Sequence, residues 1–111
     1  MNNVNEGKIS KVAINLDNQL NEDFMKSFGD NIKRILKRMI YEPDSPPFPL
    51  SIKGDRRKVK SFVEVLAREK DYLEAFKDRG EDHYDTQKKK LVLDKTAAQF
   101  ERLTGIPWPF K

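Results

Sequence analysis

Three stripes of apolar residues at helical spacing constrain the fold of this chain most strongly. A residue that ends helices follows each stripe, so the stripes predict three separate helices. The first stripe consists of Phe24, Phe28, Ile32, Ile35 and Met39. Intervals of three or four residues place these side chains on one face of a helix. Asn21 precedes the stripe as a suitable N-cap, and Pro43 prevents the helix from continuing. We therefore predict a helix between Asn21 and Pro43.

The second stripe predicts a helix that begins after Asp55 and ends at Gly80. Its members are Val59, Phe62, Val63, Leu66, Leu73 and Phe76. Asp55 is a good N-cap, and Gly80 readily adopts the left-handed conformation that terminates many helices. The apolar spacing is interrupted near Lys70, where charged residues are dense.

The third stripe predicts a helix that is capped by Asp82 or Asp85 and ends at Gly105. Its members are Leu93, Ala97, Phe100 and Leu103. The connection from the second predicted helix is short, which favours antiparallel neighbours. We therefore expect residues 55–105 to form an antiparallel helical hairpin. The predicted heart of its core consists of Phe62, Leu66, Leu73, Phe100 and Leu103.

Two short segments have the alternation of a β-strand instead. One covers residues 11–16, and the other covers residues 50–54. Their apolar members are Val12, Ile14 and Leu16 in the first, and Leu50 and Ile52 in the second. A proline-rich loop, residues 42–49, precedes the second segment. The predicted fold is therefore α+β and predominantly helical: strand, helix and strand, followed by an antiparallel helical hairpin and an aromatic C-terminal tail.

A chain of 111 residues is the size of one domain, and we expect residues 1–111 to form a single domain. The apolar fraction is 37% and the charged fraction is 36%, so the core is lean and long helical faces are solvated. The polar start, residues 1–7, is expected to be disordered, and residues 105–111 form the tail. Neither an apolar signal segment nor an apolar run that spans a membrane is present in the sequence, so we expect a cytoplasmic protein.

Residues that carry chemistry are scarce in this sequence. There is no cysteine, which excludes disulfides, thiolate zinc sites and cysteine nucleophiles. The one histidine, His83, lies in a polar turn and is interpreted as a solvated or capping residue. The sequence contains no calcium loop, phosphate loop, dinucleotide fingerprint or serine elbow. We therefore expect no catalytic residue, no metal site, no cofactor and no enzymatic activity.

Clusters of basic residues supply the first candidate site. The net charge is +4, which permits contact with an anionic partner. Two clusters are candidates for contact with nucleic-acid phosphates. Their members are Lys33, Arg34, Lys37 and Arg38 near the end of the first predicted helix, and Lys53, Arg56, Arg57, Lys58 and Lys60 around the start of the second. The alternative is that each cluster is a solvated helix face. Cations at a helix N-terminus oppose the helix dipole, so stability alone does not explain the second cluster.

The tail supplies the second candidate site. Trp108 stands between two prolines, and Phe110 follows them. The prolines hold this segment extended, which lowers the entropy that it loses when it docks. Two interpretations stay open. In the preferred one, both rings fold back and complete the core, with Trp108 covering the end of the hairpin and Phe110 more exposed. In the other, the rings dock on another protein.

The segment SIKGDRRKVKSFVEVLAREKDYLEAFKDRG and the ending FERLTGIPWPFK resemble small uncharacterised proteins of large tailed bacteriophages. The resemblance covers residues 51–111. It implies a phage accessory or virion-associated protein that acts inside a bacterium, and it implies no activity and no functional residue.

Together, these patterns predict a non-enzymatic accessory protein for interaction, assembly or regulation. Its expected partner is another protein or a second copy of the chain. The alternative is a nucleic-acid-binding accessory protein that uses the basic clusters at helix ends. No membrane partner and no small-molecule substrate are expected. The expected location is the cytoplasm, which for a phage protein is that of the bacterial host, with the virion as the alternative.

Overall fold

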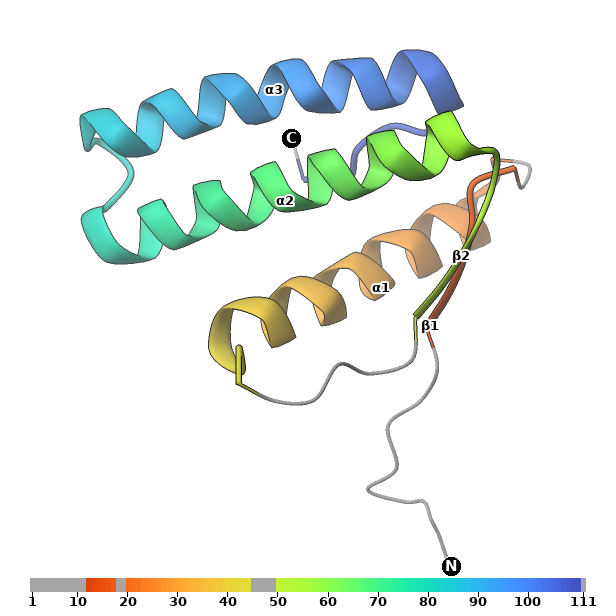
Figure 1. Ribbon diagram of the computed structural model, residues 1–111, viewed down its shortest axis with the longest axis horizontal. Coiled ribbons are helices and arrows are strands. Elements are labelled where there is room, and N and C mark those ends of the chain that lie inside the picture. The colour runs from red at the N-terminus through yellow and green to blue at the C-terminus, as the bar shows by residue number, and fades with distance from the viewer. Residues whose placement is uncertain (1–11, 18–19, 45–49, 111) are drawn as a thin grey trace, which may run out of the picture.

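The computed structural model describes residues 12–17, 20–44 and 50–110, and this part of the chain forms three helices and two short strands (Figure 1). In chain order these are β1 (Val12–Asn15), α1 (Glu22–Tyr41), β2 (Leu50–Lys53), α2 (Arg56–Arg79) and α3 (Tyr84–Thr104). The predominantly helical α+β prediction is confirmed for these residues. The predicted disordered start and residues 45–49 of the proline-rich loop lie outside the described residues.

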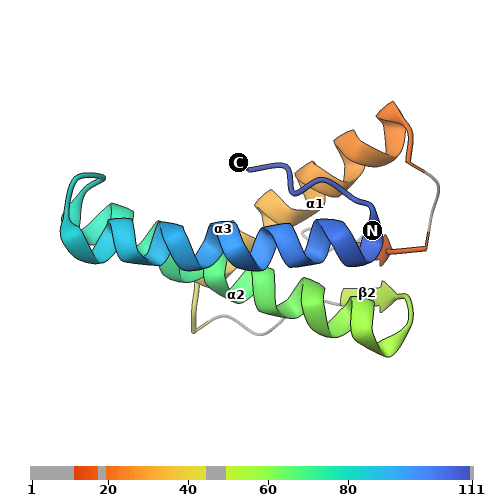
Figure 2. The same ribbon diagram turned by 90° about the horizontal axis from the view of Figure 1, so that it is seen from above.

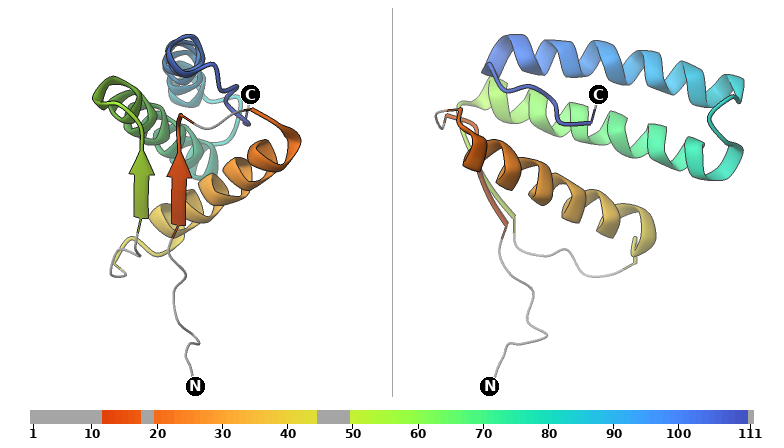
Figure 3. Two further views of the ribbon diagram at one scale, coloured as in Figure 1. Left: turned by 90° about the vertical axis from the view of Figure 1, so that its right-hand side faces the viewer. Right: turned by 180° about the vertical axis from the view of Figure 1, so that it is seen from behind.

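The two strands pair in parallel, so that β1, α1 and β2 form a β-α-β unit. Val12 lies opposite Leu50 and Asn15 lies opposite Lys53. The backbone N–H of Leu16 extends the pairing by donating to the carbonyl oxygen of Lys53 at 2.7 Å. Figure 3 shows the strands side by side and pointing the same way. The sequence predicted both strands but not how they pair.

Side-chain caps start the helices, and two of the three caps are those that the sequence predicted. The side chain of Asn21 accepts a hydrogen bond from the backbone N–H of Phe24 at 2.8 Å. Asp55 does the same for α2 at 3.0 Å. These contacts satisfy N–H groups that have no partner within the helix.

The predicted cap of α3 is wrong, because His83 occupies that position rather than Asp82 or Asp85. The Nδ1 atom of His83 accepts a hydrogen bond from the backbone N–H of Asp85 at 3.0 Å. Asp85 lies inside the first turn, and its carboxylate binds the Arg79 guanidinium at the end of α2. This ion pair spans the connection between the two helices.

The three helices and the tail surround one core. Helices α2 and α3 lie side by side, joined by residues 80–83 (Figure 1). Helix α1 crosses behind α2 at an angle, and the tail runs back from the end of α3 toward α1 (Figure 2). Gly105 adopts a left-handed conformation with φ of 76°, which turns the chain out of α3 and into the tail.

Four aromatic rings form the centre of the core. Phe28 comes from α1, Phe62 from α2, Phe100 from α3 and Trp108 from the tail. Each ring contacts the other three, with centroid distances of 5.6–6.2 Å. Every one of these residues is at most 3% exposed. The cluster therefore fixes all three helices and the tail to a common point.

Part of the predicted apolar face of α2 does not face the core. Val63 is 50% exposed and Phe76 is 42% exposed, so the prediction that both pack inside is wrong. Val65 and Glu69 are buried instead. The buried face follows positions that α3 and the tail cover, whereas Phe76 lies near the far end of α2, beyond the tail.

The predicted heart of the core is confirmed in three of its five residues. Phe62, Leu66 and Phe100 are buried. Leu73 and Leu103 are only half-buried. Leu73 lies on the side of α2 that borders the groove described below, which explains its partial exposure.

Candidate functional site

An open groove of about 600 Å³ lies between the C-terminal halves of α1 and α2, and we call it the α1–α2 groove. Its apolar walls consist of Leu36, Ile40 and Tyr41 from α1, and Tyr72, Leu73 and Phe76 from α2. Phe110 of the tail also contributes to its lining. The groove therefore lies next to the tail, between α1 and α2.

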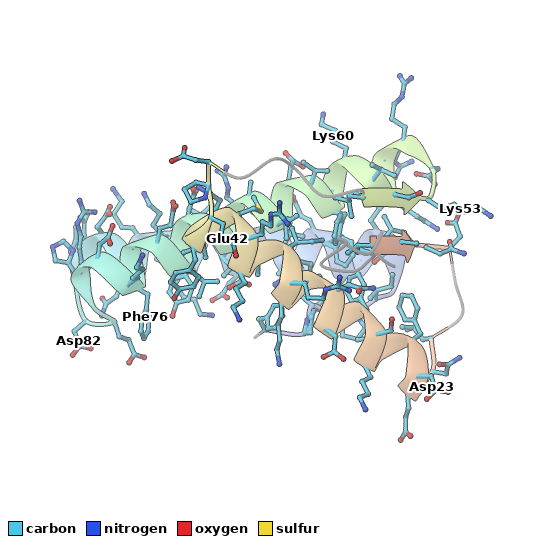
Figure 4. The ribbon with its side chains drawn as sticks, turned by 90° about the horizontal axis from the view of Figure 1, so that it is seen from below. Asp23, Glu42, Lys53, Lys60, Phe76 and Asp82 are labelled. Atoms are coloured by element: carbon cyan, nitrogen blue, oxygen red, sulfur yellow. The ribbon has the colours of Figure 1, made fainter. Side chains whose placement is uncertain are left out.

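Two aromatic residues of the groove are unusually exposed for apolar side chains. Tyr41 is 63% exposed and Phe76 is 42% exposed. In Figure 4, Phe76 projects outward from the far end of α2. Phe76 also packs edge to face on Tyr72, with ring centroids 6.0 Å apart. Exposed aromatic residues that line a concave surface are typical of binding sites.

Lysines border these apolar walls on both sides. Lys33 and Lys37 extend from α1, one helical turn apart, and Lys77 extends from α2. The Nζ atom of Lys77 lies 4.9 Å from the centre of the Tyr41 ring. Among the described residues, none of these three lysines forms an ion pair. The groove thus combines an apolar interior with an unneutralised positive rim.

A buried carboxyl group links the groove to the tail. Glu69 is 2% exposed and also lines the groove. Its Oε1 atom accepts a hydrogen bond from Nε1–H of Trp108 at 2.8 Å. Burial raises the pKa of Glu69, while the Trp108 hydrogen bond and the charge of Lys90 oppose this rise.

A second carboxylate holds the tail from the other helix of the pair. The Oε2 atom of Glu101 in α3 accepts a hydrogen bond from the backbone N–H of Trp108 at 2.7 Å. Trp108 is therefore fixed to α2 through its side chain and to α3 through its backbone. This clamp positions Phe110 at the groove.

The raised pKa of Glu69 predicts a specific pH dependence of stability. The folded chain holds this proton more tightly than the unfolded chain, so the free energy of unfolding falls as pH rises from the ordinary glutamate pKa through the raised one. Glu69→Gln removes this ionisation and keeps an oxygen that accepts the Trp108 hydrogen bond. We expect the variant to gain stability relative to the wild type as pH rises, measured by urea denaturation across the pH series.

Glu64→Gln is the matched control, because Glu64 is exposed on the same helix. It should follow the wild-type curve at every pH. Parallel curves for Glu69→Gln and the wild type would contradict the assigned burial of charge at Glu69.

The structure separates the basic residues that the sequence grouped together. In the first cluster, Lys33 and Lys37 border the groove, whereas Arg34 and Arg38 do not line it. The second cluster surrounds the other end of α2, and Figure 4 shows its Lys53 at the opposite end of the molecule from Phe76. The two clusters therefore do not merge into one surface.

Within the second cluster, Lys58 already has a protein partner. Its Nζ atom donates to Asp17 Oδ1 at 2.8 Å, and this hydrogen bond raises the pKa of Lys58. Its other four members are exposed: Lys53, Arg56, Arg57 and Lys60.

The structure places the two tail residues differently. Trp108 is 3% exposed and belongs to the core, as the preferred interpretation expects, so it is not an exposed anchor in this fold. Phe110 is half-buried and lines the groove. Glu69 was not among the predicted site residues, although its position seven residues after Phe62 continues the buried stripe of α2.

The described residues contain no group of three or more histidine, aspartate or glutamate side chains arranged to hold a metal ion. None of the helices in the described part of the chain is long and apolar enough to cross a membrane. Comparison with known proteins adds no relative, since no family model, curated protein or solved structure matches this chain.

Proposed function

We propose that this chain is a non-enzymatic interaction module that docks a partner protein in the α1–α2 groove. The observation that carries the proposal is the groove itself, whose apolar walls are open to solvent at Tyr41 and Phe76. Apolar grooves between helices are a recurring mode of protein recognition.

The rest of the fold serves in this proposal as a rigid frame. Helices α2 and α3 act as an antiparallel hairpin, which the tail closes through Trp108. The contacts of Trp108 with Glu69 and Glu101 support this role, because they hold one wall of the groove in a fixed place. A preformed groove loses little entropy when it binds.

The resemblance to proteins of large tailed phages adds a setting to the proposal. In that setting the module is an accessory or assembly factor in the cytoplasm of the bacterial host, and its partner is a phage or host protein.

The test is capture of partners by the tagged chain from its own host, after nuclease treatment, with a groove variant beside a control. Phe76→Asn removes an exposed aromatic residue from the groove. Leu91→Asn is the matched control, because Leu91 is 64% exposed on α3 and lies outside the groove. We expect a partner that survives nuclease, is lost with Phe76→Asn and is kept with Leu91→Asn. Equal capture by both variants would contradict docking in the groove.

The second candidate function is nucleic-acid binding by the exposed end of α2. Arg56 and Arg57 open this helix, and its first turn contains no acidic residue. The Asp55 carboxylate already caps this N-terminus, so the exposed guanidinium groups of Arg56 and Arg57 would supply the attraction for a phosphate. Loss of every captured partner after nuclease would favour this second function over the first.

A further inference from the structure

We propose that the partner segment is an amphipathic α-helix that carries acidic residues on both flanks of its apolar ridge. This inference rests on the proposed function of the groove and adds the chemistry of its occupant. It follows from the charge of the rim, the spacing of the lysines and the kind of walls that the groove has.

The charge of the rim selects an acidic occupant. Lys33 and Lys37 line one side and Lys77 lines the other, without an ion pair to any described residue. Glu69 is the one carboxylate among the lining residues, and it is buried and bonded to Trp108. An acidic occupant pairs with all three lysines, whereas a basic one is repelled by them.

The spacing of the lysines matches a helix. Lys33 and Lys37 are four residues apart on α1, so their side chains leave one face of that helix about 6 Å apart. Two acidic residues four apart on a partner helix have the same separation. A third acidic residue on the opposite flank then faces Lys77.

The walls also favour a helix over an extended peptide. Both walls are helices, whose backbone groups are hydrogen-bonded within α1 and α2. An extended segment binds mainly by adding backbone hydrogen bonds to a strand edge, which this groove does not offer. A helix satisfies its own backbone and presents only side chains.

A second copy of this chain is a poorer occupant. Among the described residues, the most exposed apolar pair outside the groove is Leu91 and Val92 on α3, at 64% and 47% exposure. Lys88 and Lys95 each lie one helical turn from this pair on α3, and neither forms an ion pair with a described residue, whereas Asp94 is neutralised by Lys90. This patch therefore brings further positive charge to a positive rim. The charge of the groove therefore favours a partner of opposite charge over a second copy of this chain.

The experiment is a selection from a display library of helical peptides about four turns long. Ridge positions are drawn from Leu, Phe, Ile and Ser, and flanking positions are drawn from Glu, Gln and Lys. The baits are the full wild-type chain, Lys33→Glu/Lys37→Glu and Lys60→Glu/Lys95→Glu. The last is the matched control, because it makes the same change in net charge at exposed lysines outside the groove.

We expect the wild type and the control to enrich Glu on both flanks. Lys33→Glu/Lys37→Glu should enrich Lys on one flank and bind the wild-type selected peptides about tenfold more weakly at low salt. Enrichment without a charge preference, or the same sequences from all three baits, would overturn the acidic partner. Failure of the wild-type chain to enrich any helical peptide would overturn it as well.

A counter-selection on Phe76→Asn separates the two levels of the proposal. If enriched peptides need Phe76 but show no charge preference, the groove docks a partner and the acidic chemistry is wrong. If no enriched peptide depends on Phe76, docking in the groove fails together with the acidic partner.

Discussion

Trp108→Ala should lower the free energy of unfolding by about 3–5 kcal/mol, the usual range for removal of a buried large aromatic residue. The indole contacts three phenylalanine rings of the core, and its N–H is the donor to buried Glu69. Urea denaturation followed by circular dichroism measures the loss. The wild-type tryptophan emission should also be blue-shifted, because the ring is shielded from water.

Trp108→Phe separates the ring from its hydrogen bond. It keeps most of the packing but leaves the Glu69 carboxyl without its donor, so we expect a loss of about 1–3 kcal/mol. Tyr84→Ala serves as the control, since Tyr84 is 72% exposed and should change stability little. A water-exposed emission spectrum together with an unchanged denaturation midpoint for Trp108→Ala would remove the tail from the core.

Phe100→Ala should have a loss of similar size, about 3–5 kcal/mol, because Phe100 is fully buried and contacts a ring from each of the other elements of the cluster. Thermal or urea denaturation measures it. Leu91→Ala on the same helix is the control and should stay within about 0.5 kcal/mol of the wild type.

The double variant tests whether the rings act as one cluster. Phe100 and Trp108 have centroids 5.6 Å apart, so their substitutions should not add, with a coupling of about 0.5–3 kcal/mol. Simple additivity would mean that the two rings stabilise separate parts of the fold.

Local signals in the sequence predicted the elements well. Asn21 and Asp55 cap α1 and α2, and Gly80 and Gly105 follow the ends of α2 and α3. Gly105 is left-handed, whereas Gly80 has φ of 87° and ψ of 165°, outside the left-handed helical region that was predicted for it. These signals work because a cap or a glycine with positive φ acts within one turn of its own helix. The cap of α3 was missed because Asp85 instead pairs with Arg79 across the turn.

Most of the candidate site could not be predicted from the sequence. The groove depends on how α1 crosses α2, and no local pattern encodes that crossing. Phe76 continues the apolar spacing of α2 and was therefore assigned to the core, although nothing in the described fold covers it fully. Glu69 lies in the densely charged part of α2, and nothing local in the sequence indicates its burial, because its partner Trp108 comes from the packed tail.

The parallel pairing of β1 and β2 has a consequence for the order of folding. Contacts across the turn from α2 to α3 join residues close in sequence, such as Arg79 and Asp85, six positions apart. The pairing of Val12 with Leu50 joins residues 38 positions apart, and the whole of α1 lies between them in the chain. Closing the longer loop costs more entropy, so we expect α2 and α3 to associate first and the sheet to close last. The α1–α2 groove needs α1 packed against α2, so we expect the groove to form only after α2 and α3 have associated.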